Sequence, residues 1–308
     1  MAKTIFELGK ELKKLRESKN VKPKAIYDKV CLRDEYWRYE NGYRQPSWSR
    51  FEKFLQRLGE EPRSYFVRYA MTLEDSNTLK KRNELKFLLR EENNEKYKLA
   101  EALVNELEQN ENFYRVKLNK QFLFMAKATI AFYYNDYESM LDYSKKGILI
   151  TKPDFDEEKI SSYTLFYDEI LLINQIAVAQ AKTSADRCAD MLFQLKTCLD
   201  EGYIDEEEKS RTYMHILFNL SNILGILKRY EDCLPICEKG IEFCVKHENS
   251  HFHPMFMFNR ACCLLGLGRE KNGIAQLEEA YAVVKAVKRL TELAIMKNYV
   301  EEVFGITI

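Results

Sequence analysis

Proline is scarce in this chain of 308 residues, which has only 6 prolines, and none lies between Pro62 and Pro153 or between Pro153 and Pro235. Because proline interrupts helices, long proline-free stretches rich in Leu, Lys, Glu and Ala favour helix. Glycine is also infrequent, with 11 residues, and we find no convincing run of alternating β-branched residues. These absences argue against a β-rich fold and predict an all-α protein.

Long apolar runs are missing too, and no apolar leader follows Met1. A helix that crosses a membrane needs about 20 consecutive apolar residues, so we expect a soluble, cytoplasmic protein without a membrane partner. The 8 cysteines include no Cys-x-x-Cys pair, and most fall at apolar helix positions. We interpret them as reduced thiols that pack as small hydrophobic side chains.

Signatures of enzymes are absent as well: there is no G-x-x-x-x-G-K-[ST] phosphate loop, no G-x-S-x-G and no dinucleotide fingerprint. We therefore predict no enzymatic activity and no cofactor. Cys244, His247, His251 and His253 are residue types that bind zinc. However, His247 suits a helix C-terminus and the segment reads as a loop between repeats, so we predict no metal site.

The charge is unevenly spread, although the whole chain is neutral. Residues 1–70 hold 17 Lys and Arg against 10 Asp and Glu, a net charge of +7, whereas the remainder holds 31 against 38, a net charge of −7. A small basic domain on a larger acidic one suggests a polyanionic partner for the first, with chance clustering as the alternative.

Residues 1–70 predict five short helices. Pro23 suits the first turn of the second helix, the third runs from about Leu32 to Asn41, and Gly42 is expected as its left-handed C-cap. The side chains expected to face inward are Ile5, Leu8, Leu12, Leu15, Ile26, Val30, Tyr36, Tyr39, Phe51, Phe54, Leu55, Leu58, Tyr65, Phe66 and Tyr69.

Three stretches of this region carry a resemblance. "LGKELKKLRESK", "IYDKVCLRDEYWRYE" and "YENGYRQPS" follow the pattern of a phage-repressor helix-turn-helix, ending in Glu-x-Gly and Pro-Ser. The region is similar to that of the Gram-positive peptide-pheromone regulators typified by PlcR, Rgg and PrgX. The resemblance implies that Arg16 and Glu40 pair across the first and third helices.

The resemblance also implies that the start of the third helix enters the major groove of DNA. The residues it places there are Arg33, Asp34, Trp37 and Arg38, and an arginine can read guanine with two hydrogen bonds. Lys22, Lys24 and Arg44 fall where contacts to the phosphates are expected. The sequence departs from the family pattern at Pro23, at Tyr27, at Trp37 and at Leu32, which stands where a capping Ser is usual.

The rest of the chain contains internal repeats. Residues 217–241 align without a gap on 257–281 at an offset of 40, and residues 124–148 align on 217–241 at an offset of 93, with Tyr137 on Tyr230. Two helices per unit of 40 to 48 residues predict an α-solenoid, and the pattern resembles the tetratricopeptide repeat. We expect a linker helix and the first repeat helices in 71–111, then the repeat domain in 112–308, with a capping helix from about Thr291 to Val303.

Asn174, Asn219 and Asn259 recur at one position in the first helix of three repeats, and Asn222 lies one turn beyond Asn219. An asparagine amide offers both a donor and an acceptor, so a row of them can hold the backbone of an extended peptide in the concave groove. The family resemblance implies the same use. The alternative is a hydrogen bond between repeats that fixes the geometry of the solenoid.

These features together favour a transcriptional regulator that binds double-stranded DNA as a homodimer, and the family resemblance implies that it responds to a small signalling peptide. The alternative is a protein-interaction scaffold with a degenerate helix-turn-helix, which Pro23, Tyr27 and Leu32 favour and the positive charge of residues 1–70 opposes. A repeat-containing enzyme or phosphatase regulator has no residue support.

Overall fold

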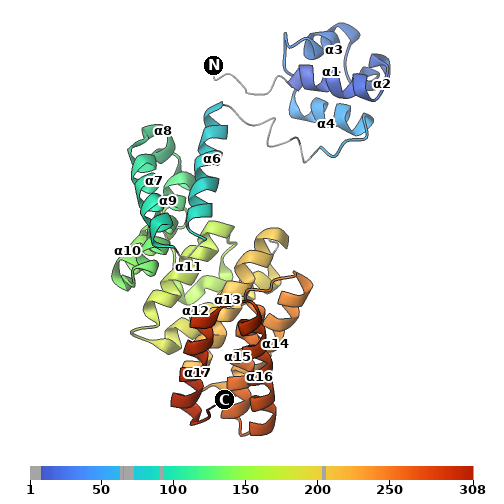
Figure 1. The fold of residues 1–308 in the computed structure, drawn as a ribbon. Coiled ribbons are helices and arrows are strands. Elements are labelled where there is room, and N and C mark those ends of the chain that lie inside the picture. Colours follow the sequence, from blue (N-terminus) through green and yellow to red (C-terminus); the bar gives the residue numbers. More distant parts are fainter. Residues whose placement is uncertain (1–7, 63–64, 66–72, 91–92, 203–205, 308) are drawn as a thin grey trace. The chain divides into compact units, whose positions relative to one another are not determined.

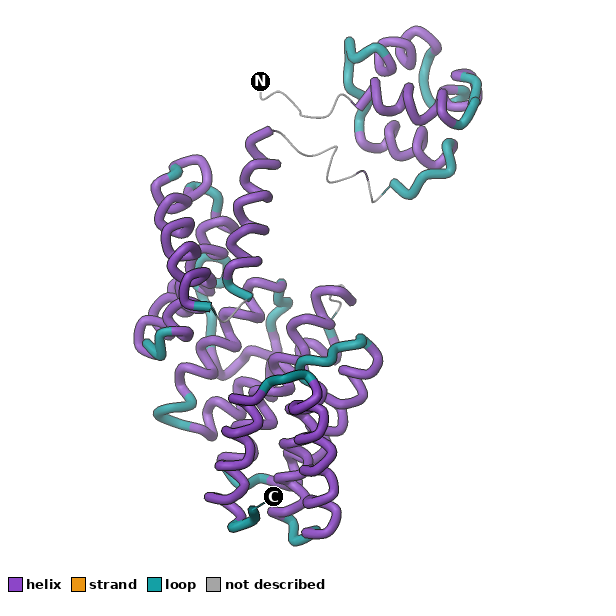
Figure 2. Tube along the Cα trace, in the orientation of Figure 1, coloured by secondary structure: helices purple, strands orange, loops and turns teal. Residues whose placement is uncertain are grey.

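Every regular element in the part of the chain that the structure describes is helical (Figure 2). This computed structural model describes residues 8–62, 65, 73–90, 93–202 and 206–307. The chain separates into two compact units, residues 1–87 and 88–308. The prediction of an all-α protein is confirmed, whereas the boundaries predicted at residues 70 and 111 stay predictions.

The first unit contains the helices α1 (Leu8–Ser18), α2 (Pro23–Tyr27), α3 (Arg33–Glu40) and α4 (Trp48–Arg57), followed by α6 (Leu73–Leu88) (Figure 1). One small core joins the first four, as the helical spacing of the apolar residues predicts. Ile5, Phe66 and Tyr69 lie outside the described residues. The core consists of Leu12, Ile26, Tyr36, Tyr39, Phe51, Phe54, Leu55 and Leu58.

Helix α2 is shorter than the sequence suggests, because it ends at Tyr27 and leaves the half-buried Val30 beyond it. Lys29 then adopts a left-handed conformation, with φ of 57°. The guanidinium of Arg57 satisfies the end of the helix by donating to the carbonyl oxygens of Ile26 at 3.0 Å and Asp28 at 2.6 Å. This contact spans about 30 positions in sequence, so local pattern could not place the end of the helix.

The second unit is a series of antiparallel helix pairs (Figure 1). Its elements are α7 (Asn94–Gln109), α8 (Glu111–Tyr114), α9 (Lys117–Tyr133), α10 (Tyr137–Ile148), a 3-10 helix η1 (Glu157–Ser162), α11 (Tyr167–Gln180), α12 (Ala185–Glu201), α13 (Glu206–Ile226), α14 (Tyr230–Lys246), α15 (His253–Gly266), α16 (Glu270–Ala286) and α17 (Leu290–Phe304). The segment 71–111, predicted to hold a linker helix and the first repeat helices, contains α6 and α7 in its described part. Asn93 begins α7 by accepting a hydrogen bond from the amide of Glu95 at 2.9 Å.

The turns inside three helix pairs, α9–α10, α13–α14 and α15–α16, share one geometry. A residue in the left-handed region ends the first helix, and the next amide donates back to a carbonyl five residues earlier, as in a Schellman motif. The left-handed residues are Asn135, Lys228 and Gly268, with φ of 60°, 55° and 74°. The closing bonds are Asp136 to Ala131 at 2.8 Å, Arg229 to Leu224 at 2.9 Å and Arg269 to Leu264 at 2.8 Å. The alignment of Tyr137 on Tyr230 is confirmed, since each is the first residue of its helix.

Close packing joins one repeat to the next. A Cβ atom added at Gly240 on α14 would lie 2.5 Å from the ring of Phe256 on α15, and one at Gly147 on α10 would lie 2.8 Å from Leu172 on α11. The first helices of successive repeats also contact one another, from α9 through α11, α13 and α15 to α17. They therefore form one layer of the solenoid.

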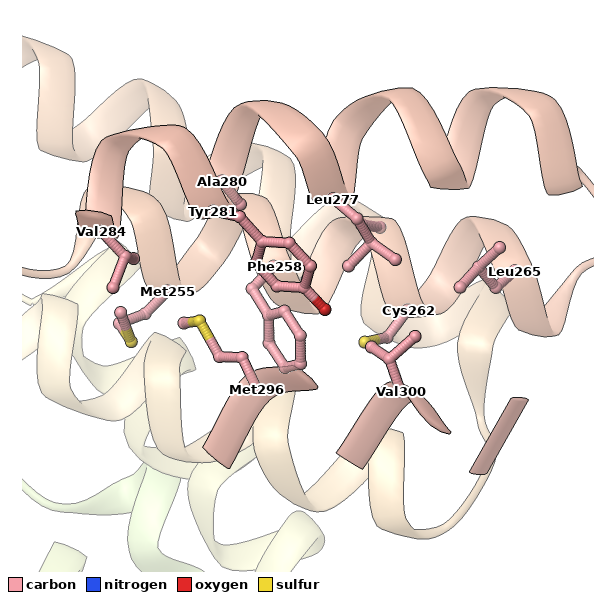
Figure 3. Close-up of a cluster of buried hydrophobic side chains, with 11 residues drawn as sticks. Met255, Phe258, Cys262, Leu265, Leu277, Ala280, Tyr281, Val284, Met296 and Val300 are labelled. Carbon is pink, nitrogen blue, oxygen red and sulfur yellow. The ribbon is translucent and has the colours of Figure 1, made fainter. Parts of the chain in front are cut away.

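Helix α17 packs on the helix pair before it, and the capping role expected of the segment from about Thr291 to Val303 stays a prediction. Met296 and Val300 of α17 pack on a core formed by α15 and α16, which includes Phe258, Cys262 and Tyr281 (Figure 3). The apolar face that α15 and α16 would otherwise expose at the end of the series is covered in this way.

Candidate DNA-binding surface and repeat interface

Helix α3 has one buried face and one exposed face. Tyr36, Tyr39 and Glu40 are buried. Arg33, Asp34, Trp37 and Arg38, which the sequence predicts as groove contacts, are all exposed and recur at the spacing of one helical stripe. The structure therefore brings these four side chains together on one solvent-facing surface, called here the α3 face.

A buried ion pair fixes α3 against α1. Arg16 donates from Nε to Oε1 of Glu40 at 2.6 Å and from a terminal nitrogen to Oε2 at 3.1 Å, and the hydroxyl of Tyr36 donates to Oε1 at 2.8 Å. The Arg16 side chain is 11% exposed and that of Glu40 is 8% exposed. The pair that the family resemblance implied is present, with the bidentate geometry that a buried pair requires.

An exposed aromatic pair at the edge of the α3 face was not predicted. Gly42 adopts φ of 76°, and the amide of Tyr43 donates to the carbonyl oxygen of Arg38 at 3.0 Å. This turn places the ring of Tyr43 on that of Trp37, with centroids 5.5 Å apart and planes 20° apart. Tyr43 is 74% exposed and Trp37 is 55% exposed. The aromatic residue after Gly42 was the available signal for this pair.

The three cations expected to contact phosphates differ in their surroundings. Lys22 and Lys24 are exposed at the start of α2. Arg44 is also exposed but lies 3.7 Å from Glu35, which accepts a stronger contact from Arg50. A hydrogen bond from Tyr39, together with the neighbouring arginines, holds the pKa of Glu35 below its ordinary value. Glu35 therefore stays ionised and partly neutralises Arg44.

Leu32 makes no side-chain cap for α3 and is 78% exposed. The sequence predicted the missing cap. An exposed leucine beside the α3 face is also an apolar group in a position to meet another molecule.

The four asparagines that the sequence singles out lie on first helices of repeats and bond in two pairs. Nδ2 of Asn219 on α13 donates to Oδ1 of Asn174 on α11 at 3.0 Å. Nδ2 of Asn259 on α15 donates to Oδ1 of Asn222 at 2.7 Å and to Oγ of Ser221 at 2.8 Å. The hydrogen bonds between repeats that the sequence left as an alternative are therefore present, and Asn222 takes part in one.

A further amide extends this row. Nε2 of Gln175 on α11 donates to Oγ1 of Thr129 on α9 at 2.8 Å. We call Gln175, Asn174, Asn219, Asn222 and Asn259, together with the hydroxyl partner Thr129, the amide row. All except Gln175 are half-buried. Each amide has two N–H groups and two acceptor positions, so the bonds between repeats leave hydrogen-bonding capacity on the amide row.

The residues of 244–254 that were considered as metal ligands contact different neighbours. Sγ of the buried Cys244 contacts Sδ of Met214 at 3.8 Å. The ring of His247 lies 4.3 Å from that of Phe243, and the ring of His251 lies 5.0 Å from that of Phe252. These contacts are those of packed side chains.

Solved structures are similar to the chain over nearly all of its length. No protein-family model and no curated protein sequence matches the chain. The structure of PlcR from Bacillus thuringiensis with the peptide PapR7 and DNA is similar, with 20% identity, a TM-score of 0.68, and coverage of 95% of this chain and 98% of that one.

Two other structures are similar over comparable lengths. ComR from S. thermophilus, in complex with DNA and its signalling peptide ComS, has 13% identity and a TM-score of 0.63, covering 94% of this chain and 97% of that one. The SHP pheromone receptor Rgg2 from Streptococcus dysgalactiae has 14% identity and a TM-score of 0.61, covering 96% and 99%.

Within the described residues, no helix combines the length and the apolar character that crossing a bilayer requires. The agreement with the three solved structures extends through both units, from the first helices to the last repeat. The chain therefore has the fold of the regulators PlcR and ComR and of the pheromone receptor Rgg2.

Proposed function

We propose that the protein is a cytoplasmic, non-enzymatic transcriptional regulator that binds operator DNA as a homodimer and is controlled by a small peptide bound to its repeats. The observation that carries the proposal is the α3 face, where Arg33, Asp34, Trp37 and Arg38 are exposed on a helix that is fixed by a buried ion pair. The fold is that of a regulator solved with both peptide and DNA, which supports the proposal.

The α3 face suits a major groove, which admits one α-helix. Arg33 is the first residue of α3 and is exposed, so its guanidinium is available to the O6 and N7 atoms of a guanine. Lys22 and Lys24 supply sequence-independent attraction to phosphates. A dimer would place two such helices on half-sites separated by about 34 Å, one turn of DNA.

The amide row suits the backbone of an extended peptide. Its members come from the first helices of successive repeats, so their spacing follows the solenoid and not the turn of one helix. Next to it on α13, His215 and Ile226 are exposed, which gives side chains of a peptide both polar and apolar partners. We propose Asn174, Asn219, Asn222 and Asn259 as peptide contacts.

The alternative function is a scaffold whose first unit does not bind DNA specifically. The uncapped start of α3 at Leu32 and the bulky Trp37–Tyr43 pair favour it. Its distinguishing property is a repeat unit that captures a protein partner while residues 1–87 bind DNA only weakly and without preference.

Binding of the full-length chain to DNA from upstream of its own gene tests the proposal. Fluorescence anisotropy should show a specific complex whose log K falls linearly with log salt, because Lys and Arg release counterions from DNA. Arg33→Ala should cost roughly 1–3 kcal/mol on that site and relax preference at one base step. Lys24→Ala should weaken all sequences alike.

Lys271→Ala, at an exposed position on α16, is the matched control and should leave DNA affinity unchanged. If the full-length protein binds no upstream fragment at low salt, the scaffold alternative replaces the proposal. A base-preference profile that Arg33→Ala leaves unchanged would remove Arg33 from the residues that read DNA.

A further inference from the structure

Three buried thiols converge between two repeats. Cys233 and Cys237 lie one turn apart on α14, and Cys263 lies on α15, the first helix of the next repeat. The three Sγ atoms all lie within 4.8 Å of one another, and those of Cys233 and Cys237 are 3.7 Å apart. Their exposed fractions are 1%, 0% and 1%.

The neighbouring Cys262 is directed elsewhere. It belongs to the core cluster of α15, α16 and α17, with Leu277 and Val300 (Figure 3). Adjacent residues of a helix diverge by about 100° around its axis, so Cys263 faces α14 when Cys262 faces that core. Ordinary core packing needs one small apolar side chain at each position, whereas this arrangement brings three sulfur atoms to a single point.

In the described part of the chain, cysteine sulfur is the only side-chain ligand type that gathers here, and Sγ of Cys233 also donates to the backbone carbonyl oxygen of Ser221 at 3.2 Å. Among the described residues, no further His, Cys, Asp or Glu lies close enough to join the three sulfur atoms. Structural zinc sites take four ligands in a tetrahedral arrangement, so a three-sulfur set does not meet that preference. Soft thiolate ligands also select monovalent copper, which accepts three ligands. Three sulfur atoms that each lie about 2.3 Å from a central ion in a planar triangle lie about 4 Å from one another. The Sγ atoms of Cys233 and Cys237 are 3.7 Å apart, which is close to this value.

We propose that Cys233, Cys237 and Cys263 form a binding site for one monovalent copper ion. The ion is transferred as Cu(I) from a thiol carrier: its bond to the carrier sulfur breaks as bonds to the cysteine sulfur atoms form. Because cysteine binds metals as the thiolate, protons leave the cysteines and pass to the released carrier thiolate and to solvent. No electron is transferred.

Copper at this site would join successive repeats. Asn259, which bonds to Asn222, lies one turn before Cys263 on the same helix α15. An ion bonded to both α14 and α15 therefore fixes the helix that carries one member of the amide row. We expect copper to raise the melting temperature of the second unit, because a ligand that binds only the folded state stabilises it.

An anaerobic titration of the full-length protein with Cu(I), buffered by the chelator bathocuproine disulfonate, tests the site. Wild-type protein should take one copper ion from the chelator and develop near-ultraviolet sulfur-to-copper absorption. Cys237→Ala and Cys263→Ala should each leave the copper with the chelator. Cys188→Ala, at a buried cysteine on α12, is the control and should still bind one ion.

A second measurement uses wild-type protein and does not depend on how the variants fold. In mild denaturant, Cu(I) should protect Cys233, Cys237 and Cys263 from alkylation, as mapped by mass spectrometry, and leave Cys188 and Cys198 as reactive as before. Failure to compete with the chelator, protection of other cysteines, or tighter binding of zinc than of copper would each overturn the assignment.

Discussion

Arg16 and Glu40 hold opposite charges in an environment that excludes most water, with side chains 11% and 8% exposed. A buried ion pair contributes little compared with an apolar pair of the same shape, but removing one partner leaves an uncompensated charge. The stability of the first unit should therefore respond asymmetrically to single and double substitutions at these positions.

We predict that Arg16→Met lowers the free energy of unfolding of the first unit by about 3–5 kcal/mol. Arg16→Met combined with Glu40→Leu should recover most of that loss. Both tryptophans, Trp37 and Trp48, lie in the first unit, so tryptophan fluorescence in urea reports this unit selectively. A double variant that is less stable than Arg16→Met would contradict the prediction.

The amide of Asn219 connects two repeats through its bond to Asn174. We predict that Asn219→Ala lowers the free energy of unfolding by about 1 kcal/mol, the net contribution of a typical hydrogen bond. If the amide also holds a peptide backbone, the variant should bind peptide more weakly. From spent culture medium it should then capture roughly ten to a hundred times less peptide than wild-type protein does.

Circular dichroism gives the stability, and mass spectrometry of the retained peptides gives the capture. Asn272→Ala, at an exposed position on α16, is the matched control. A large loss of stability with unchanged peptide capture would assign Asn219 to the solenoid alone.

At the scale of helices, Asp200 joins three elements of the second unit. From the last turns of α12 it accepts hydrogen bonds from Tyr213 on α13 at 2.5 Å, from Lys239 on α14 at 2.8 Å and from Lys196 on its own helix at 2.7 Å. Burial favours the neutral acid, but these bonds outweigh it and hold the pKa of Asp200 at about 2, below the ordinary value of 3.8.

We predict that Asp200→Asn lowers the free energy of unfolding by about 1 kcal/mol at pH 7, allowing for solvent screening of a side chain that is 29% exposed. Because the folded-state pKa is depressed, the contribution is fully present above the unfolded-state pKa near 3.8 and disappears as the pH falls toward 2. Denaturant unfolding across this range measures it. As the pH falls toward 2, the stability of Asp200→Asn should approach that of wild type. Asp190→Asn, at an exposed position on α12, should show no such change in its difference from wild type.

Elements whose signals are local were predictable from the sequence. The stripe Phe51, Phe54, Leu55 is buried as its spacing requires, and Pro23 begins α2. The end of α2 was not predictable, because Arg57 reaches it from α4. The same reason applies to the thiols: the spacing of Cys233 and Cys237 indicates a shared helix face, but the approach of Cys263 depends on how two repeats pack.

For the candidate sites, the exposure of Arg33 and Arg38 followed from the inward positions of Tyr36 and Tyr39. The bonds within the amide row did not follow from sequence alignment. Asn259 aligns with Asn219 in sequence yet bonds to Asn222, one turn farther along α13. Alignment gives the equivalent position in each repeat, whereas the angle between repeats decides which side chains meet.

For the whole molecule, the proposal assigns DNA to one compact unit and peptide to the other. If the peptide changes DNA affinity by some factor, linkage requires DNA to change peptide affinity by the same factor. We predict this equality for the full-length protein. Anisotropy titrations of operator DNA with and without a captured peptide, and of labelled peptide with and without DNA, measure both factors. Factors of one in both titrations would show that peptide and DNA bind independently, which would contradict control of DNA binding by the peptide.

The turn shared by three of the helix pairs has a consequence for how repeats can be duplicated. Its left-handed residue and its closing hydrogen bond lie within a single helix pair, as in Lys228 with the bond from Arg229 to Leu224. A duplicated gene segment that encodes one pair would therefore bring a complete turn with it and need no compensating change elsewhere. A tandem duplication of this kind would leave a gapless match such as that of residues 217–241 with 257–281.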